Sequence, residues 1–148
     1  MPANEISPRL FLGSMEDGAD AHFLVENKVS HILAVMSPHE MRYPVRYATV
    51  AYKHVDLQDD PKAPIEDSIE ITNKWIDAAL SDPVAVVLVH CRLGMSRSAA
   101  TVCGYLMRRD GLTFDGALAL VKRARPIASP NSGFIEKLKG AEKVWTKK

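Results

Sequence analysis

A cysteine and an arginine six residues apart stand between an apolar run and a segment with helical character. They are Cys91 and Arg97, in the stretch HCRLGMSRS, which also holds Gly94 and Ser98. If a strand ends just before the cysteine and a helix begins near residues 96–98, the residues between them form a tight loop with N–H groups pointing inward. Unpaired N–H groups at a helix N-terminus favour an anion, and an arginine can donate two hydrogen bonds to a tetrahedral one. The spacing therefore predicts a phosphate-sized binding loop.

Cys91 at the floor of this loop is suited to nucleophilic attack. A free cysteine is only a few per cent thiolate at neutral pH. Lowering its pKa by about three units requires roughly 4 kcal/mol of preferential stabilisation of the anion. A helix dipole contributes at most ~2 kcal/mol, so the loop N–H groups, the Arg97 charge and the Ser98 hydroxyl must supply the rest. Gly94 suits a backbone that takes unusual torsion angles beside an oxyanion. A thiolate aimed at a bound phosphoryl group predicts displacement at phosphorus through a phosphocysteine.

The elements that must position this loop form an α/β pattern. Val84–His90 is a continuous apolar run, typical of a central strand covered on both faces. Further strands are expected at Arg9–Gly13, Ser30–Met36 and Tyr47–Leu57, and helices at Asp17–Lys28, Ile65–Leu80, 98–110, 113–125 and 130–145. We predict one domain spanning 1–148, with a central, mostly parallel, twisted sheet of four to five strands flanked by helices. The loop would follow the C-terminal end of the central strand, where such sheets place their sites.

Composition narrows the function further. Of the 148 residues, 47% are hydrophobic and 25% charged, and the formal net charge is +1, so nothing global indicates nucleic acid or an anionic membrane as a partner. No apolar run reaches the length of a membrane span. Cys91 and Cys103 are read as free thiols in a reducing compartment, the cytoplasm or the nucleus. The five histidines are scattered, so we expect no metal and no other cofactor.

The loop and its surroundings resemble the dual-specificity group of cysteine-based protein phosphatases. HCRLGMSRS matches the signature H-C-x-x-G-x-S-R-S, and the segments ISPRLFLG, SHILAV, CGYLM and RPIASPNSGF are similar to further segments of that family. The likeness covers nearly the whole chain. It implies a protein phosphatase that hydrolyses phosphotyrosine and phosphoserine or phosphothreonine on protein substrates through a phosphocysteine. The chain is expected to act as a monomer.

The resemblance also implies a general acid in the loop before the long helix. That loop, VDLQDDPKAPI, offers Asp56, Asp59 and Asp60. Register against Ile65 favours Asp59, with Asp60 second and Asp56 third. The acid would protonate the leaving oxygen and then, as a base, activate water. The alternative is that all three aspartates only solvate a turn and cap a helix.

Other residues around the loop receive supporting roles from the resemblance. Ser98 would stabilise the thiolate as phosphocysteine breaks down, or act as a helix N-cap. His90 would order the loop through hydrogen bonds to backbone, and Asn131 would brace the loop or cap the last helix. The residues expected to bind the phosphate or line the mouth of its pocket are Arg92, Leu93, Gly94, Met95, Ser96 and Arg97.

Several alternatives stay open at this point. The chain could be a catalytically weak or dead phosphoprotein-binding module, a phosphatase for a non-protein phosphate ester, or a rhodanese-like carrier. A single cation between Cys91 and Arg97 disfavours a lipid substrate. Cys103, in an apolar helix, is read as a small core residue. A basic cluster is interpreted as a docking surface or a solvated helical face; its members are Arg108, Arg109, Lys122, Arg123 and Arg125.

Overall fold

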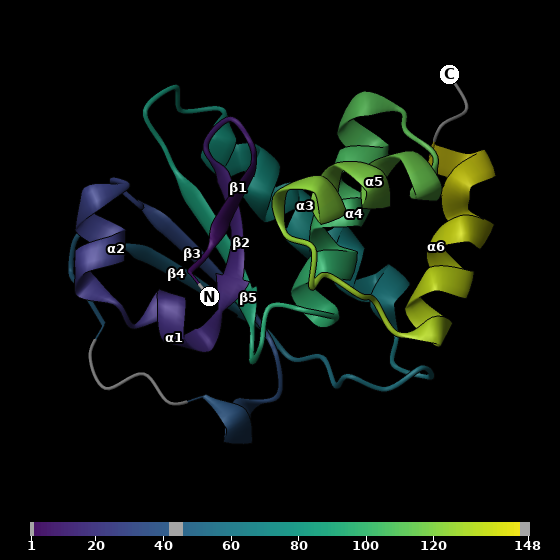
Figure 1. Cartoon of the computed structure of the whole chain (residues 1–148), viewed down its shortest axis with the longest axis horizontal. Coiled ribbons are helices and arrows are strands. Elements are labelled where there is room, and N and C mark those ends of the chain that lie inside the picture. The colour runs from purple at the N-terminus through teal and green to yellow at the C-terminus, as the bar shows by residue number, and fades with distance from the viewer. Residues whose placement is uncertain (1, 42–45, 146–148) are drawn as a thin grey trace.

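A five-stranded sheet forms the centre of the computed structural model, which describes residues 2–41 and 46–145 (Figure 1). The strands are β1 (Asn4–Ser7), β2 (Leu10–Ser14), β3 (His31–Val35), β4 (Ala51–Val55) and β5 (Val87–Cys91), in the order β1-β2-β5-β3-β4. The β1–β2 pair is antiparallel and the other pairs are parallel. The predicted fold class, a mostly parallel sheet flanked by helices, is confirmed.

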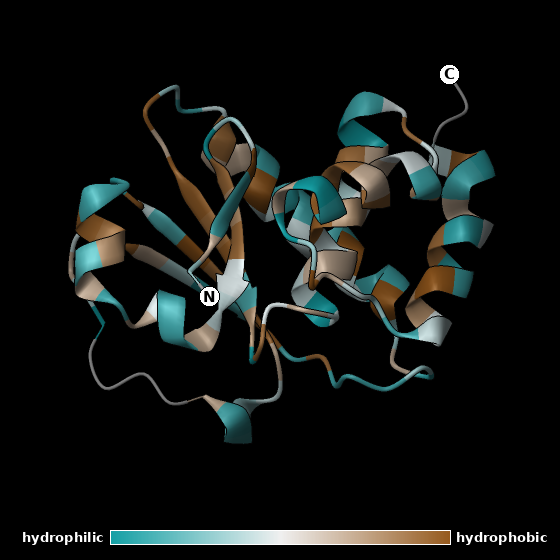
Figure 2. Cartoon of the chain, in the orientation of Figure 1, coloured by the Kyte–Doolittle hydropathy of each residue, from teal (hydrophilic) through white to brown (hydrophobic). Residues whose placement is uncertain are grey.

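Helices cover both faces of the sheet. They are α1 (Met15–Gly18), α2 (Ala21–Glu26), α3 (Ile65–Leu80), α4 (Arg97–Asp110), α5 (Phe114–Ala124) and α6 (Ser132–Trp145), and a short 3₁₀ turn, η1, spans Pro38–Glu40. The α4 helix packs against the sheet and is surrounded by α3, α5 and α6, while α2 lies on the opposite face. Hydrophobic residues concentrate on the strands and on the inward sides of the helices (Figure 2). Consequently α4, between the sheet and three helices, is buried from Arg97 to Met107.

The two faces of the sheet support two separate cores. Val87 and Val89 of β5 join the large core under α3–α6, whereas Leu88 between them joins a smaller core with Phe23 and Leu24 of α2. Alternate side chains of a strand point to opposite faces, so a strand covered on both sides must be apolar throughout. This explains the uninterrupted apolar run before Cys91.

One strand of the structure was not predicted, and two predicted elements have different bounds. The strand β1 was not predicted, because its four residues, NEIS, hold a single apolar side chain. The expected helix over Asp17–Lys28 is two short helices, since Asp20 accepts a hydrogen bond from the N–H of Phe23 and begins a new one. The strand expected at Tyr47–Leu57 is confined to Ala51–Val55.

The central strand also lies later in the chain than predicted. It begins at Val87 rather than Val84 and includes Cys91, which pairs with Ser14 of β2. The nucleophile candidate is therefore the last residue of a buried strand and not the first residue of a loop. The predicted α3 helix, Ile65–Leu80, agrees at both ends.

The described residues contain neither a membrane-spanning helix nor a cluster of metal ligands. Within 2–41 and 46–145, no helix has the length and apolar character needed to cross a bilayer. Across the same residues, no group of three or more His, Cys, Asp or Glu side chains is arranged to hold a metal ion.

Candidate active site

The candidate site lies where the parallel strands end. The segments that follow β3, β4 and β5 meet at the same end of the sheet, at the bottom of Figure 1. They enclose a hollow of about 440 Å³ lined by Glu40, Asp59, Cys91, Arg92, Leu93, Met95, Ser96, Arg97, Ser129 and Asn131. Arg92, Leu93 and Met95 are exposed at its rim, while Cys91 is only 2% exposed. The pocket thus brings the predicted acid loop, residues 56–64, beside the predicted phosphate loop, residues 91–97.

Each backbone carbonyl from residue 91 to residue 96 accepts a hydrogen bond that turns it away from the pocket. The carbonyl of Cys91 accepts from His90 Nδ1, and the carbonyl of Arg92 accepts from the N–H of Met15. Arg125 donates to the next two carbonyls. The last two, at residues 95 and 96, accept from the N–H groups of Ser129 and Ala100 at 2.6 and 2.9 Å.

The outward carbonyls determine where the N–H groups point. In a trans peptide the C=O of one residue and the N–H of the next are opposed, so the N–H groups of residues 92–97 face the pocket. Ser96, the residue before α4, makes no side-chain cap to the helix. The first N–H groups of α4 are therefore not occupied by a capping hydroxyl and can bind an anion.

The sulfur of Cys91 lies beside the Ser98 hydroxyl. The two atoms are 3.0 Å apart, and both residues are buried. Ser98 is inside α4, one residue beyond its start, so the interpretation of Ser98 as an N-cap is wrong. In this position the hydroxyl can donate a hydrogen bond to a sulfur anion.

Arg97 is held from one side by Glu40. Its Nη1 and Nη2 donate to Oε1 and Oε2 of Glu40 at 3.0 and 2.9 Å, and Nη1 also donates to Leu57 O at 3.1 Å. These bonds use three of the five guanidinium N–H groups. Nε is buried and has no partner among the described residues. The N–H of Nε and the second N–H of Nη2 form one edge of the guanidinium, and this edge can accommodate two oxygens of a phosphate.

Electrostatics keeps this pair charged. The hydrogen bond from Arg97 lowers the pKa of the Glu40 carboxyl below its usual value. Burial by itself would lower the pKa of Arg97, but the hydrogen bond to Glu40 and the charges of Cys91, Glu40 and Asp59 together raise it. Both partners therefore remain ionised near neutral pH.

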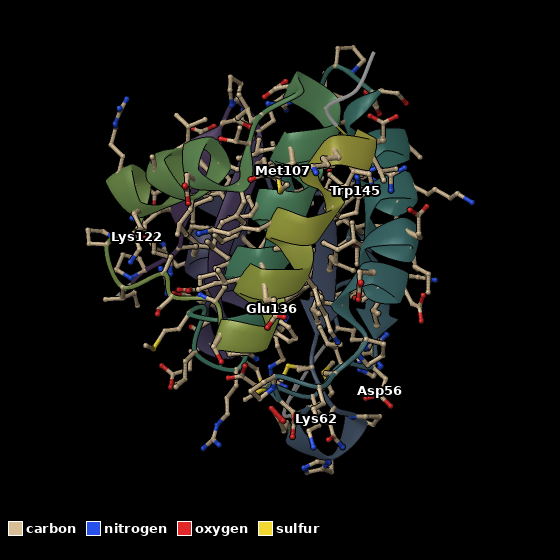
Figure 3. All side chains as sticks on the ribbon, turned by 90° about the vertical axis from the view of Figure 1, so that its right-hand side faces the viewer. Asp56, Lys62, Met107, Lys122, Glu136 and Trp145 are labelled. Atoms are coloured by element: carbon tan, nitrogen blue, oxygen red, sulfur yellow. The ribbon has the colours of Figure 1, made fainter. Side chains whose placement is uncertain are left out.

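Asp59 is the aspartate of its loop that lines the pocket. Its Oδ1 accepts hydrogen bonds from Ser96 Oγ at 2.7 Å and Asn131 Nδ2 at 2.9 Å, which leaves Oδ2 without a hydrogen bond among the described residues. Asp60 instead accepts from the N–H of Lys62, and Asp56 and Asp60 line a separate hollow. Figure 3 shows Asp56 and Lys62 at this end of the molecule, far from Trp145 at the end of α6.

Asn131 makes both of the contacts considered for it, to the site loops and to the start of α6. Its Oδ1 accepts from the N–H of Phe134 and caps α6, while its Nδ2 binds Asp59 and its own N–H donates to Ser96 Oγ. Nearby, a side chain on Gly133 would overlap the backbone of Pro61. The first turn of α6 therefore packs directly against the acid loop.

His90 is fully buried below the phosphate loop. Its Nδ1 lies 3.1 Å from Cys91 O, and because a carbonyl only accepts, Nδ1 carries the proton in the neutral ring. Burial lowers the pKa of His90 to about 4. The imidazole is therefore neutral under ordinary conditions, and its Nδ1–H donates to the carbonyl of Cys91.

Two residues of the site were not identified from the sequence. Glu40 lies 57 positions from Arg97, and no local pattern links them. Arg125 was placed in a basic cluster interpreted as a docking surface or a solvated helical face, but it is only 1% exposed and its guanidinium contacts the phosphate loop. The sequence signal that could have identified Arg125 is the segment RPIASPNSGF, which begins with it and resembles a segment of the phosphatase family. Cys103 is a buried free thiol whose pKa burial raises to about 12, in keeping with its interpretation as a core residue.

Comparison with known proteins identifies the family. Residues 10–144 match the family model described as dual specificity phosphatase, catalytic domain. The chain is 39% identical over 144 residues to human protein phosphatase Slingshot homolog 3, covering 97% of this chain and 21% of that protein. It is 41% identical over 135 residues to mouse dual specificity protein phosphatase 19, covering 90% of this chain and 59% of that protein. The chain thus spans about a fifth of the Slingshot relative and just over half of the second.

Solved structures agree with the sequence comparison. A human tyrosine phosphatase-like serine/threonine/tyrosine-interacting protein superposes with a TM-score of 0.89 at 31% identity, covering 97% of each chain. Human DUSP28 superposes with a TM-score of 0.88 at 33% identity, covering 97% of this chain and 95% of that one. The chain belongs to the dual specificity phosphatase catalytic-domain family.

Proposed function

We propose that the chain hydrolyses phosphotyrosine and phosphoserine or phosphothreonine in proteins through a phosphocysteine at Cys91. The observation that carries the proposal is the outward turn of every carbonyl from residue 91 to residue 96. The opposed N–H groups surround the space in front of the Cys91 sulfur, which suits the three non-bridging oxygens of a phosphate monoester. The free edge of Arg97 would bind two of those oxygens.

In the first step the Cys91 thiolate attacks phosphorus and the ester P–O bond breaks. The leaving oxygen takes its proton from Asp59, whose Oδ1 is fixed by Ser96 and Asn131. Protonation matters more for an alkoxide than for the phenolate of tyrosine, whose conjugate acid has a pKa near ~10. Phosphotyrosine is therefore the substrate expected to react fastest.

In the second step water attacks the phosphocysteine and the S–P bond breaks. Asp59, now ionised, accepts the proton of that water. The Ser98 hydroxyl, 3.0 Å from sulfur, stabilises the departing thiolate. Inorganic phosphate leaves and the enzyme returns to its starting state without a metal or other cofactor.

The experiment is hydrolysis of an aryl phosphate at mildly acidic pH by the wild type and by Cys91→Ser. We expect turnover by the wild type, competitive inhibition by vanadate, and no turnover by the variant. Trapping of ³²P on wild-type protein, with accumulation in Ser98→Ala, would identify the intermediate. Tight phosphopeptide binding without hydrolysis would instead identify a binding module, and hydrolysis confined to small esters would identify a non-protein substrate.

The setting of this activity is part of the same proposal. The substrate would be a phosphorylated protein, and the enzyme would act as a monomer in the cytoplasm or nucleus, where a thiolate stays reduced. One domain over residues 1–148 would suffice for catalysis. Neither a nucleic acid nor a membrane is required as a partner.

A further inference from the structure

Arg125 is a buried cation whose hydrogen bonds, within the described residues, go to carbonyl and amide oxygens and not to a carboxylate. It follows α5 and is 1% exposed. Its Nε donates to Gly94 O at 2.8 Å and its Nη2 to Leu93 O at 3.3 Å. Its Nη1 donates to Pro2 O at 3.0 Å and to Asn4 Oδ1 at 2.9 Å. Burying an arginine in this way is costly, so its set of acceptors requires an explanation.

We propose that Arg125 is a positioning residue that holds the phosphate loop in its anion-binding conformation and places a second positive charge behind it. This inference rests on the proposed function, because it concerns the same loop. Arg125 supplies two of the six outward hydrogen bonds, those in the middle of the loop. With the carbonyls of Leu93 and Gly94 turned outward, the N–H groups of the residues after each of them face the pocket.

Gly94 and Arg125 depend on each other. Gly94 has a φ of +71°, a conformation that other residues rarely adopt. A Cβ there would lie 2.6 Å from Gly13 O and 2.7 Å from Arg125 Nη2. The guanidinium thus packs directly against the backbone at the point where the loop turns, and any shift of Arg125 changes the space available to that turn.

The charge of Arg125 also acts on the nucleophile. Burial lowers the pKa of Arg125, while the charges of Asp17 and Cys91 act in the opposite direction. Because electrostatic attraction is mutual, the guanidinium attracts any negative charge placed at the position of Cys91. Asp17, the carboxylate that faces it, is engaged by the N–H and hydroxyl of Ser14 and offsets part of the charge.

The N-terminal strand completes this support. Pro2 O and Asn4 Oδ1 hold Nη1 on the side away from the loop, across more than 120 residues of sequence. These two acceptors orient the planar guanidinium so that Nε and Nη2 face the loop carbonyls. The β1 segment is therefore a part of the active-site scaffold, although none of its residues lines the pocket.

The test compares Arg125→Met and Arg125→Lys with a matched control, Arg9→Met. Arg9 also donates to three carbonyls, those of Leu80, Asp82 and Ala85, but it precedes β2 and lies at the opposite end of the sheet. Two readouts are needed: the inhibition constant of vanadate against an aryl phosphate, and the rate at which iodoacetamide alkylates Cys91, located by mass spectrometry. Cys103, buried with a raised pKa, contributes little signal.

We expect vanadate to bind Arg125→Met about tenfold more weakly, since a lost charge-assisted hydrogen bond has an effect of this order. Alkylation near pH 6 should slow about tenfold, because the thiolate is the form that reacts and it loses a neighbouring positive charge. Arg125→Lys keeps the charge but not the planar set of donors. It should recover part of the alkylation rate and little of the vanadate affinity. Arg9→Met should change neither readout.

Wild-type values in a folded Arg125→Met, or equal losses in Arg9→Met, would overturn the inference. If Arg125→Met does not fold, Asn4→Ala decides: a vanadate constant raised about threefold supports the inference, and an unchanged one contradicts it. A wild-type protein that vanadate does not inhibit, with Cys91 unreactive near pH 6, would contradict the proposed function itself. Failure of the inference and failure of the function are therefore distinguishable.

Discussion

The phosphate loop, residues 91–97, and the acid loop, residues 56–64, lie on two sides of one pocket but are held in different ways. All the carbonyls of the phosphate loop up to residue 96 are bound by donors from the surrounding structure. In the acid loop Asp56, Asp59 and Asp60 are exposed. This loop is held by the two donors to Asp59 Oδ1, by Gly133 against Pro61, and by Lys137 Nζ, which donates to Ala63 O at 2.9 Å.

This difference separates anion binding, which depends on the phosphate loop, from proton transfer, which is proposed for the acid loop. The cradle of the nucleophile is built from main chain, and main chain can be moved only by disturbing several buried bonds at once. The proposed acid, Asp59, is held by the side chains of Ser96 and Asn131, the residues just before α4 and α6, and a single substitution can remove either contact while the main-chain bonds of the cradle remain. Changes to the acid loop should therefore affect turnover and spare anion binding, whereas changes around the phosphate loop should affect both.

The largest expected effect comes from the acid itself. Asp59→Asn should lower kcat by about 10²–10⁴-fold, because the leaving oxygen loses its proton donor. Vanadate affinity should change little, since the cradle is untouched. A pH–rate profile should lose the limb that reports the acid. The matched control is Asp60→Asn, whose carboxylate binds Lys62 N–H in a different hollow; near-normal activity in Asp59→Asn with loss in Asp60→Asn would reassign the acid.

A substitution on the phosphate side should give a different signature. Glu40→Gln removes the charge that fixes Arg97, so the guanidinium edge facing the pocket is no longer oriented. We expect vanadate affinity and kcat/KM to fall together by roughly 10–100-fold, as for a disrupted partly buried ion pair. Steady-state kinetics with vanadate competition measures both.

The control for this variant is a second glutamate–arginine pair. Glu70 pairs with Arg108 at 2.8 Å, but the two side chains are 54% and 33% exposed, and exposed pairs contribute little. Glu70→Gln should leave both constants unchanged. Tighter vanadate binding by Glu40→Gln would mean that Glu40 competes with the phosphate instead of orienting Arg97.

The same contrast explains how much of the molecule can be predicted from sequence. Cys91 and Arg97 belong to one short motif whose spacing and apolar flanks are local, and α3 follows from helical periodicity alone. Glu40 and Arg125 were missed because their roles depend on contacts 57 and about 30 residues away. Arg125 binds carbonyls, which every residue carries, so no pattern of side chains marks its acceptors.

Asp59 lies between these cases. Its loop is recognisable before α3, but three aspartates fit the composition, and only contacts with Ser96 and Asn131 distinguish one of them. The strand β1 was missed for a related reason: its pairing with β2, and not its own residues, makes it a strand. Tertiary contacts override weak local preference in both instances.

A more selective way to separate the loops is Gly133→Ala. The added Cβ would meet the backbone of Pro61, which cannot move as a flexible side chain can, so the acid loop must shift. We expect kcat to fall about tenfold, as misplacement of a catalytic group does, while Cys91 alkylation stays at the wild-type rate. Gly140→Ala, on the same helix with open space around it, should leave both rates unchanged. Slower alkylation in Gly133→Ala would show that the two loops are coupled.

The smallest expected effect concerns stability and tests whether the phosphate loop rests on a neutral imidazole. The pKa of buried His90 is lowered to about 4, whereas a histidine in the unfolded chain titrates near ~6.5. In this pH range the unfolded state therefore binds a proton that the folded state does not bind. The folded state loses stability as the pH falls from about 6.5 toward 4. Above about pH 6.5 the contribution of the neutral ring is fully present.

At about pH 5.5 this loss should amount to roughly 1.4 kcal/mol of unfolding free energy. Urea unfolding at about pH 7.5 and pH 5.5 gives the drop in unfolding free energy for each protein. The drop should be larger in the wild type than in His90→Gln, which cannot titrate but can still donate to Cys91 O. His22→Gln, at an exposed residue paired with Glu26, should keep the wild-type dependence. Equal pH dependence in the wild type and His90→Gln would mean that the buried ring accepts a proton in the folded state, and the strand end beneath the nucleophile would then tolerate a charge.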